Sequence, residues 1–461
     1  NEISDGPIDY VALRQQLPEA DIRMKAGKDN IFSRFLKYCG YTFTSADMNM
    51  TMSAATGMNG ALQVNELTAA GVLLDTIRFN VVSDSVNCIY NGQIRNSKNN
   101  PQYVFNSLFD GYVFDQGSGL NISIYDAANR LGLKLGATAT IEDTGTRLHL
   151  LTDDIILGYK RFEANENNYL FLGDDNRVSA NLKLKSADGM GLQVYTNDEN
   201  QDALQDITVG LSNFDLSKIT SVLPYFPKIK GNMNGDFHAI QTKENITLSS
   251  NLSVDKMTYE GCSLGDISTE FVYIPQEDGS HYLDAVLFSE GSQVGSLIGT
   301  YHPAGKGVLN ADLKLEHLPM NIVNGFIPQQ LFGFEGYADG SMKVRGELSK
   351  PHVDGEVFLD SMYMVSVPYG VKLRFSDDPV RVVDSKLMLE NFEVFGHNDN
   401  PLNIYGNINF ADLDNVYMDV RMKATNYQLI NSKENYRSVA YGKAYICLLY
   451  TSPSPRDRQK S

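Results

Sequence analysis

Nearly the whole chain alternates apolar and polar residues with a period of two, and this feature most constrains the fold. Within residues 336–361, Met342 and Val344 point to one side of a strand while Lys343 points to the other, which is typical of a half-buried strand. A turn in the middle of this stretch predicts a hairpin with one apolar and one polar face. Gly355 falls on the apolar side, where its missing side chain leaves room for a close neighbour.

The same alternation recurs from residue 41 to residue 446, and turn sequences such as DQGSG, EDTGT and GDDN separate the runs. Short loops between alternating runs predict a meander of antiparallel strands. No helical pattern long enough to cover the apolar side accompanies the strands. The apolar face must therefore close on itself, pack on another sheet or hold an apolar ligand.

Residues 1–40 form the least strand-like part of the chain. Asp29 is placed to cap a short helix that ends before Gly40, and Phe32, Phe35 and Leu36 fall on one side of it. We interpret this segment as a packing helix whose apolar side joins the core.

Two stretches, starting at residues 214 and 317, resemble each other. Each predicts a short apolar helix (residues 216–223 and 320–326), a proline-containing stop and a Gly-x-x-x-Gly entry into a strand. Gly231 and Gly336 lie 105 residues apart, as do Gly235 and Gly340. This internal repeat favours a solenoid-like array. It leaves open whether the short helices lie inside a groove or cap its edge.

The alternation and the repeat together predict a division of the chain. Residues 1–40 are a mixed segment, residues 41–215 a first β-meander, and residues 216–446 a second meander with repeats 216–315 and 318–446. The segment CLLYTSPSPRDRQKS, residues 447–461, breaks the alternation. We interpret it as a non-native tail encoded by a sequencing adapter. The first residue is Asn1, and we expect the chain to be an internal fragment of a longer protein.

Charge and motifs argue against several functions. A net charge of −17 without a cluster of Lys and Arg disfavours nucleic acid and anionic membrane surfaces as partners. The seven histidines are scattered, and the chain contains no HExxH, GxSxG or P-loop sequence. The acidic pairs lack the spacing of a calcium loop. We therefore expect no catalytic residue, no metal and no cofactor. Cys39 and Cys88 could pair in space, although the four cysteines show no metal-site or disulfide-framework spacing.

Several phrases resemble the TamB (translocation and assembly module) family within the AsmA-like superfamily of diderm bacteria. They include AGKDNIFSRFLKYCGYTF, ITSVLPYFPKIKGNMNGDF and HNDNPLNIYGNINF, and the most specific is GEVFLDSMYMVSVPYGV at residues 355–371. The resemblance extends over nearly all of residues 1–446. It implies an all-β fold in which an elongated, strongly curved antiparallel sheet forms a taco-like, solenoid-like groove with a few short helices.

The resemblance also implies a location and partners. The chain would be the periplasmic body of an envelope-spanning protein, anchored in the inner membrane by an N-terminal segment outside this sequence. It would extend towards an Omp85-type barrel protein in the outer membrane. Such proteins are implicated in moving phospholipid between the two membranes and, alternatively, in the assembly or secretion of outer-membrane proteins.

Our leading hypothesis is a non-enzymatic conduit whose apolar groove contacts phospholipid acyl chains. The methionines on the apolar face suit a surface that adapts to varied apolar ligands, although methionine also fills gaps in ordinary cores. The residues predicted to line the groove are Met342, Val344, Val371, Leu373, Phe375, Leu402, Ile404, Met418, Val420 and Met422.

Two alternatives stay open. The chain could be a scaffold whose exposed sheet edge pairs with strands of nascent outer-membrane proteins. It could also be a string of closed β-sandwich modules with dry cores. The sequence does not identify the lipid, the direction of transport or its energy source.

Overall fold

The computed structural model describes residues 10–84, 86–114, 117–197, 199, 203–327, 332–347, 350–366, 371–412 and 415–427, and the backbone of residues 443–450. Within these residues the fold is all-β with a few short helices, as the sequence predicts. Two compact units are present, Asn1–Glu244 and Asn245–Ser461. The boundary between them falls after the division at residues 215/216 that the repeat predicts.

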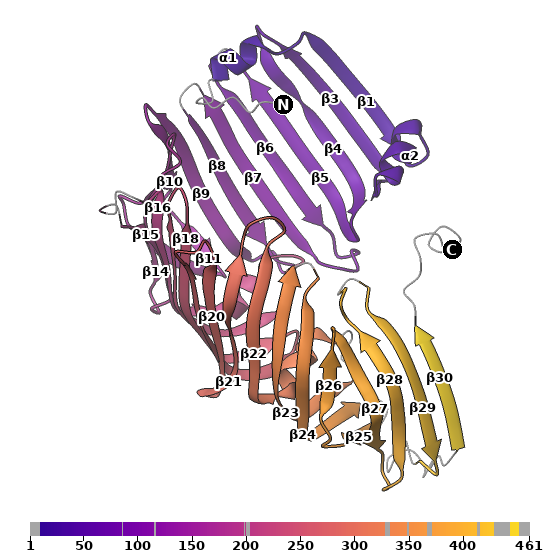
Figure 1. The fold of residues 1–461 in the computed structure, drawn as a ribbon. Coiled ribbons are helices and arrows are strands. Elements are labelled where there is room, and N and C mark those ends of the chain that lie inside the picture. The colour runs from indigo at the N-terminus through magenta and orange to yellow at the C-terminus, as the bar shows by residue number, and fades with distance from the viewer. Residues whose placement is uncertain are drawn as a thin grey trace. The chain divides into compact units, whose positions relative to one another are not determined.

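The first unit is an antiparallel sheet with three short helices (Figure 1). The helices are α1 (Tyr10–Gln15), α2 (Ile31–Tyr38) and α3 (Leu216–Thr220). The strands are β1 (Ala20–Gly27), β2 (Tyr41–Thr42), β3 (Ser45–Ser53), β4 (Gly57–Ala69), β5 (Val72–Ser83), β6 (Cys88–Asn96), β7 (Phe105–Phe114), β8 (Gly117–Tyr125), β9 (Leu131–Glu142), β10 (Gly145–Leu150), β11 (Ile155–Leu157), β12 (Lys160–Ala164), β13 (Tyr169–Gly173), β14 (Val178–Ser186), β15 (Gly191–Thr196), β16 (Gln205–Asp215) and β17 (Ile229–Gln241).

The second unit is also an antiparallel sheet, with one short 3-10 helix, η1 (Met320–Phe326), among its described residues. Its strands are β18 (Ile246–Tyr259), β19 (Cys262–Pro275), β20 (His281–Ser289), β21 (Ser292–His302), β22 (Val308–Pro319), β23 (Gly333–Glu347), β24 (His352–Ser366), β25 (Val371–Phe375), β26 (Val380–Val383), β27 (Lys386–Phe395), β28 (Pro401–Asn409), β29 (Tyr417–Thr425) and β30 (Lys443–Tyr450). The backbone of β30 pairs with β29 and crosses the predicted native end at residue 446. Residues 451–461 lie outside the described residues.

Most strands pair with their neighbours in the chain, but each unit has a place where two short strands replace one long strand. In the first unit, β10 and β11 both pair with β9, and β12 and β13 both pair with β14. In the second unit, β25 and β26 both pair with β24 and with β27. In Figure 1, β3 to β8 are seen broadside while β14 to β16 of the same unit are seen nearly edge-on, so the first sheet curves strongly.

The hairpin predicted around residues 336–361 is confirmed as β23 and β24. On β23, Met342 and Val344 are half-buried and Lys343 is exposed, and the same alternation continues along β24. Met342 lies directly opposite Gly355. A Cβ atom added to Gly355 would stand 2.8 Å from Cγ of Met342. The glycine therefore admits a close neighbour, as the sequence predicts.

The structure corrects two details of the first helical segment. The cap of α2 is Asn30 and not Asp29, because the Asn30 side chain accepts a hydrogen bond from the backbone N–H of Ser33 at 2.8 Å. Leu36 packs on a buried cluster, as expected, but the Phe35 side chain is 64% exposed and does not join the core. Only one side of a helix can face a sheet. Phe35 lies outside the side of α2 that does so.

The Gly-x-x-x-Gly repeat has a structural explanation in a recurrent β-bulge. Asn213 on β16 and His317 on β22 adopt left-handed backbone conformations, with φ of 47° and 53°. The backbone N–H of Asn213 donates to Oδ1 of Asn234 at 2.7 Å, and that of His317 donates to Oδ1 of Asp339 at 2.7 Å. The register of each strand pair shifts at these positions. The side chain before the second glycine therefore supplies the acceptor that the bulge requires.

The cysteines of the described residues are unpaired. Cys39 is exposed, Cys88 and Cys262 are half-buried, and all three are free thiols. The pairing of Cys39 with Cys88 that the sequence left open is therefore not formed.

Candidate functional site

The candidate site is one face of the second unit's sheet, which we name the Met342 face. Residues directly opposite each other in antiparallel strands point to the same side of the sheet. The register therefore defines rows that cross this face from strand to strand. One row, from β19 to β29, contains Phe271, Ala285, Leu297, Leu313, Met342, Gly355, Val382, Leu387, Ile408 and Met418. Every member except the glycine carries an apolar side chain.

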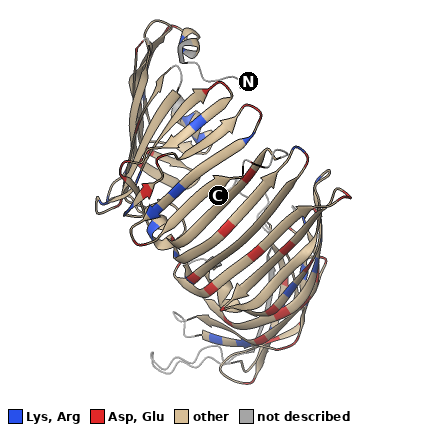
Figure 2. Ribbon diagram, turned by 90° about the vertical axis from the view of Figure 1, so that its left-hand side faces the viewer, with Lys and Arg blue, Asp and Glu red and all other residues tan. Residues whose placement is uncertain are grey.

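The opposite side is mainly charged on β22 to β24, whereas on β19 to β21 it also carries Val272, Val286 and Ile298. Lys343 lies directly opposite Asp312 on β22 and Asp354 on β24, and all three side chains are exposed. Figure 2 shows acidic residues recurring as red bands on successive strands of the second unit. A single step along β23, from residue 342 to residue 343, therefore passes from an apolar row to a charged one.

The Met342 face is only partly shielded from water between β19 and β24. Leu297, Leu313, Met342 and Val344 are all half-buried. Among the described residues of the second unit, the one helical element is η1, which has seven residues. That helix contacts the ends of strands, as shown below. The described residues of the second unit therefore supply no covering layer for the regular part of this face.

The structure separates the ten residues predicted to line a groove into two groups. Met342 and Val344 lie on β23 in the regular part of the sheet. The other eight join two clusters beside the split strands β25 and β26, and both clusters contain Phe392 and Ile404. The first cluster includes Val371, Leu373, Phe375, Leu402 and Ile404, and the second includes Ile404, Met418, Val420 and Met422.

Burial differs within these clusters. Val420 is 2% exposed and Leu373 is 7% exposed, so both are core residues, and neither offers much surface to a ligand. Val371, Phe375, Leu402, Ile404, Met418 and Met422 are half-buried. Both clusters include residues of the split strands, so the buried residues of this face gather there.

Sequence reasoning did not select the residues of β21 and β22 that share the row of Met342. Leu297 lies opposite Leu313, which in turn lies opposite Met342. Leu315, on the same strand as Leu313, lies opposite Gly340. Their signal was present in the alternation of LNADLKLEHL. Strand register, which the sequence alone does not give, is what assigns them to this face.

The first unit has an equivalent apolar row, and we name its side of the sheet the Phe79 face. The row from β1 to β9 contains Met24, Met48, Leu62, Phe79, Gly92, Phe109, Ile122 and Leu135. Phe79 and Phe109 stack with ring centroids 6.4 Å apart. A Cβ atom on Gly92, which lies between them in the register, would stand 2.1 Å from Cζ of Phe109. A glycine therefore makes room for a large apolar side chain in both units.

The short helices that the repeat predicts lie along strand ends. After α3, the Tyr225 hydroxyl donates to the carbonyl of Leu73 at 2.7 Å and accepts from Nδ2 of Asn96 at 2.8 Å. These residues begin β5 and end β6. In the second unit, Nδ2 of Asn321 donates to the carbonyl of Ser263 at 3.1 Å, near the start of β19. Both helical segments therefore contact the ends of strands within their own unit.

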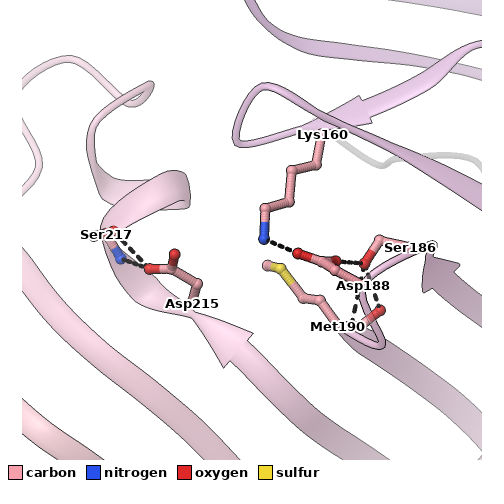
Figure 3. A network of polar contacts seen from close by, with 6 residues as sticks. All are labelled: Lys160, Ser186, Asp188, Met190, Asp215 and Ser217. Carbon is pink, nitrogen blue, oxygen red and sulfur yellow. Dashed lines mark hydrogen bonds and ion pairs between the residues drawn. The ribbon is translucent and has the colours of Figure 1, made fainter.

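Figure 3 shows a polar network near the start of α3. Asp188 accepts hydrogen bonds from Lys160 and Ser186, and the Ser186 hydroxyl also accepts from the backbone N–H of Met190 at 3.1 Å. The Lys160 ammonium, together with Ser186, lowers the pKa of Asp188 to about 2. Met190 is 1% exposed and belongs to the core cluster at the first unit's split strands. This network stabilises a turn, and none of its groups is arranged for acid–base catalysis.

In the part of the chain that the structure describes, no group of three or more His, Cys, Asp and Glu side chains could hold a metal ion. None of its helices is long and apolar enough to span a membrane.

Comparison with known proteins gives no assignment. No protein-family model, curated protein or solved structure matches the chain.

Proposed function

We propose that this chain is the periplasmic body of an AsmA-like envelope protein of the TamB type, and that its Met342 face carries phospholipid acyl chains. The observation that supports this proposal is the apolar row from Phe271 to Met418, which crosses successive strands without a polar side chain. A binding site for one small ligand would need only a few of these strands.

Acyl chains match this row chemically. Burying apolar surface contributes about 25 cal/mol per Å², and each buried methylene of a lipid contributes about 0.8 kcal/mol. Most members of this row are half-buried Leu, Met, Ile and Phe side chains, and only Val382 is fully buried. Such side chains offer apolar contacts along the row without directional hydrogen bonds. Lipid bound in this way can move along the row, because each position offers nearly the same free energy as the next.

The cellular setting of the proposal comes from the sequence resemblance. It places the chain between two membranes, with an inner-membrane anchor outside this sequence and an Omp85-type barrel as the outer-membrane partner. In this setting the protein transfers phospholipid and performs no chemical reaction.

The alternative function, a scaffold for outer-membrane protein assembly, requires an open strand edge. In the described residues, β1 pairs only with β3, so its other side is an edge. The side chains of Arg23 and Lys25 on β1 are highly exposed. Charged side chains on an edge strand oppose the addition of another strand. This observation disfavours strand addition at the β1 edge.

Site-specific photo-crosslinking in cells tests the proposal. One variant carries the photoreactive residue at position 342 and a matched control carries it at position 343, where it points towards Asp312 and Asp354. We expect mass spectrometry of the purified protein to find covalently attached phospholipid at position 342 and none at position 343. Equal labelling at both positions, or no lipid on a folded protein, would overturn the conduit. Crosslinks to outer-membrane proteins instead would favour the scaffold.

A further inference from the structure

The helix α2 presents an apolar side to solvent. Ile31, Phe35 and Tyr38 follow one another at spacings of four and three residues, which places them on one side of the helix. They are 81%, 64% and 92% exposed. Tyr38 and Ile31 are the two most exposed large apolar residues of the described chain, and only Val82 on β5 matches Phe35. Exposed apolar side chains that gather on one side mark an interaction site, whereas scattered ones are ordinary.

The other side of α2 is attached to the sheet. Ser33 is 5% exposed, and its hydroxyl donates a hydrogen bond to the carbonyl of Lys28 at 2.8 Å. Leu36 packs on the buried cluster that contains Phe43. The start of the helix is capped by Asn30, as described above. Because the helix is capped and packed on its inner side, its outer side chains are held on a preformed surface.

Cations accompany this apolar side. Lys28 stands just before the capping residue, and Arg34 and Lys37 lie one turn apart on the helix. All three side chains are exposed, and none forms an ion pair within the described part of the chain. The one carboxylate of residues 28–40 is Asp29, whereas the chain as a whole carries a net charge of −17. The charge around α2 is therefore opposite in sign to that of the chain.

The neighbouring strand leaves this local charge unchanged. On β1, Arg23 pairs with Asp21 at 3.1 Å and Lys25 pairs with Asp47 at 3.4 Å. The helix α2 follows β1 directly, and β1 is an edge strand in the described part of the first unit. Figure 1 shows α2 at the end of this strand. Because α2 lies at a corner of the unit's sheet, an extended flat surface can reach it.

We infer that α2 docks the protein on an anionic phospholipid bilayer, with Ile31, Phe35 and Tyr38 inserted among the lipids and Arg34 and Lys37 against their phosphates. Amphipathic helices that combine basic residues with exposed aromatic and aliphatic side chains bind membrane surfaces in this way. Tyrosine favours the boundary between acyl chains and headgroups. Each cation near an anionic membrane surface adds to the affinity.

A bilayer fits this surface better than a second copy of the chain does. Two copies that met through α2 would bring Arg34 and Lys37 of each against the same cations of the other, and like charges oppose such a contact. An anionic bilayer would repel the acidic remainder of the chain and attract this corner. The cations did not stand out as a cluster in the sequence because they are spread over residues 28–37.

This inference does not rest on the lipid conduit. It concerns a helix of the first unit, whereas the conduit concerns the Met342 face of the second unit. It gives the chain a membrane contact of its own, apart from the anchor that the sequence resemblance places outside this sequence.

Vesicle flotation with the full chain tests the inference. The vesicles contain phosphatidylglycerol and phosphatidylcholine in equal amounts, and vesicles of phosphatidylcholine alone are the neutral comparison. We expect the protein to float with the anionic vesicles and to bind the neutral ones at least about tenfold more weakly. Arg34→Gln/Lys37→Gln should weaken binding to anionic vesicles by at least about tenfold. The matched control, Lys343→Gln/Arg345→Gln, removes an exposed lysine and an exposed arginine of the second unit and should leave binding unchanged.

A second pair of variants tests the apolar side of α2. Ile31→Gln/Phe35→Gln should abolish flotation, because insertion of these side chains supplies the apolar part of the affinity. The matched control is Val82→Gln/Ile89→Gln at the end of β5 and the start of β6, where the two residues are 64% and 56% exposed. All four positions are exposed, so the variants should fold, and circular dichroism verifies this.

The chain contains no tryptophan, so Tyr38→Trp reports insertion directly. We expect its emission to shift to shorter wavelength with anionic vesicles and to be quenched by brominated lipid. The control is Phe358→Trp on β24 of the second unit, whose phenylalanine is 44% exposed. Its emission should show neither change.

Several results would overturn the inference. They are no flotation, equal binding to neutral vesicles, unchanged affinity in either double variant of α2, and no emission change in the Tyr38→Trp protein. Self-association of the chain that Ile31→Gln/Phe35→Gln removes, without flotation, would reject the bilayer and assign α2 to a contact between copies. A protein crosslinked in cells at position 38, without flotation, would reject the bilayer in favour of a protein partner.

The outcome is independent of the crosslinking at position 342, because that experiment reads a face of the other unit. Lipid crosslinked at position 342 without flotation would reject membrane docking by α2 and keep the conduit. Flotation that depends on α2 without lipid at position 342 would keep the docking helix and reject the Met342 face as the lipid path.

Discussion

Met342 lies directly opposite Gly355, and a Cβ atom on that glycine would stand 2.7 Å from the Met342 Cα and 2.2 Å from the carbonyl oxygen of Ser341. The third close contact of that Cβ atom, at 2.8 Å, is with Cγ of the Met342 side chain, whereas the first two are with backbone atoms. A side chain at position 355 would therefore force β23 away from β24. The close approach of these strands holds Met342 in the row that crosses the face.

Replacing this glycine should destabilise the second unit. We expect Gly355→Ala to lower the free energy of unfolding by about 1–3 kcal/mol, as overpacking does elsewhere, and urea unfolding followed by circular dichroism measures the change. Gly27→Ala is the control, because a Cβ atom there meets nothing within 4 Å, and it should change stability by less than about 0.5 kcal/mol. Equal stability of the two variants would contradict the close approach.

The bulge at His317 predicts a difference between two substitutions of one residue. Asp339→Ala removes the acceptor of the His317 backbone N–H, and we expect a loss of about 1–2 kcal/mol. Asp339→Asn keeps an acceptor oxygen and should be nearly neutral, since Asn234 fills the corresponding position in the first unit. Urea midpoints of the two variants test this. An Asn variant as unstable as the Ala variant would contradict the role assigned to the side-chain oxygen.

The network in Figure 3 predicts a stability change in acid. Hydrogen bonds from Lys160 and Ser186 hold the pKa of Asp188 at about 2, below the ordinary range of an aspartate. A depressed folded-state pKa stabilises the protein above the unfolded-state value, and this contribution is lost as the pH falls from about 4 to about 2. Thermal midpoints of wild type and Asp188→Asn should therefore differ above pH 4 and converge near pH 2. A constant difference across this range would exclude the linkage.

The hydroxyl of Tyr427 is buried without a hydrogen-bond partner among the described residues. We expect Tyr427→Phe to stabilise the protein by about 1 kcal/mol, because it removes an unsatisfied polar group. Tyr225→Phe, which removes a hydroxyl with two partners, should destabilise by a similar amount. Opposite signs in thermal unfolding would support the distinction, whereas equal losses would reveal a partner for the Tyr427 hydroxyl.

Tyr427 also predicts a change in alkali. Burial raises its pKa from 10.0 to about 12. A raised folded-state pKa stabilises the protein below the unfolded-state value, and the contribution is lost as the pH rises from about 10 to about 12. Absorbance at the tyrosinate band, compared between wild type and Tyr427→Phe, should show one late-titrating tyrosine missing from the variant.

A carboxylate on the Met342 face should interrupt lipid contact. We expect Leu313→Asp to abolish lipid crosslinking at position 342, because Leu313 lies directly opposite Met342 and acyl chains do not solvate a charge. The control is Ile298→Asp on the other side of the sheet, where Ile298 is 45% exposed and lies opposite Asp312. Crosslinking that survives in the Leu313→Asp protein would show that lipid reaches position 342 by another route.

The alternation was enough to predict the fold class and the side on which Met342 and Lys343 point. It did not predict that Leu373 and Val420 would be buried. Both residues belong to the clusters beside β25 and β26, where two short strands replace one long strand. An alternation of period two does not indicate where a strand is replaced in this way. The cap at Asn30 was missed because Asp29 and Asn30 are both good N-cap residues. Two neighbouring residues of similar capping strength do not fix a helix start.

The hollow of the first unit lined by Phe105, Val222 and Phe226 was not predicted from the sequence either. Its wall combines Phe105 with Val222 and Phe226, which are more than a hundred residues further along the chain. Only the fold brings them together. The Gly-x-x-x-Gly repeat marked the strand that follows, but the acceptor role of Asn234 and Asp339 became evident only from their hydrogen bonds.

Antiparallel pairing between consecutive strands has a consequence for how such proteins change length. Each apolar row contains one residue from every strand that it crosses. An inserted hairpin adds two strands to the sheet, and it fits if these strands pair in register with the strands on either side. A gene could therefore lose or duplicate a whole hairpin and keep every remaining row continuous, whereas a single-residue insertion within a strand would turn its apolar side chains outward. Related chains built in this way would thus be expected to differ by even numbers of strands.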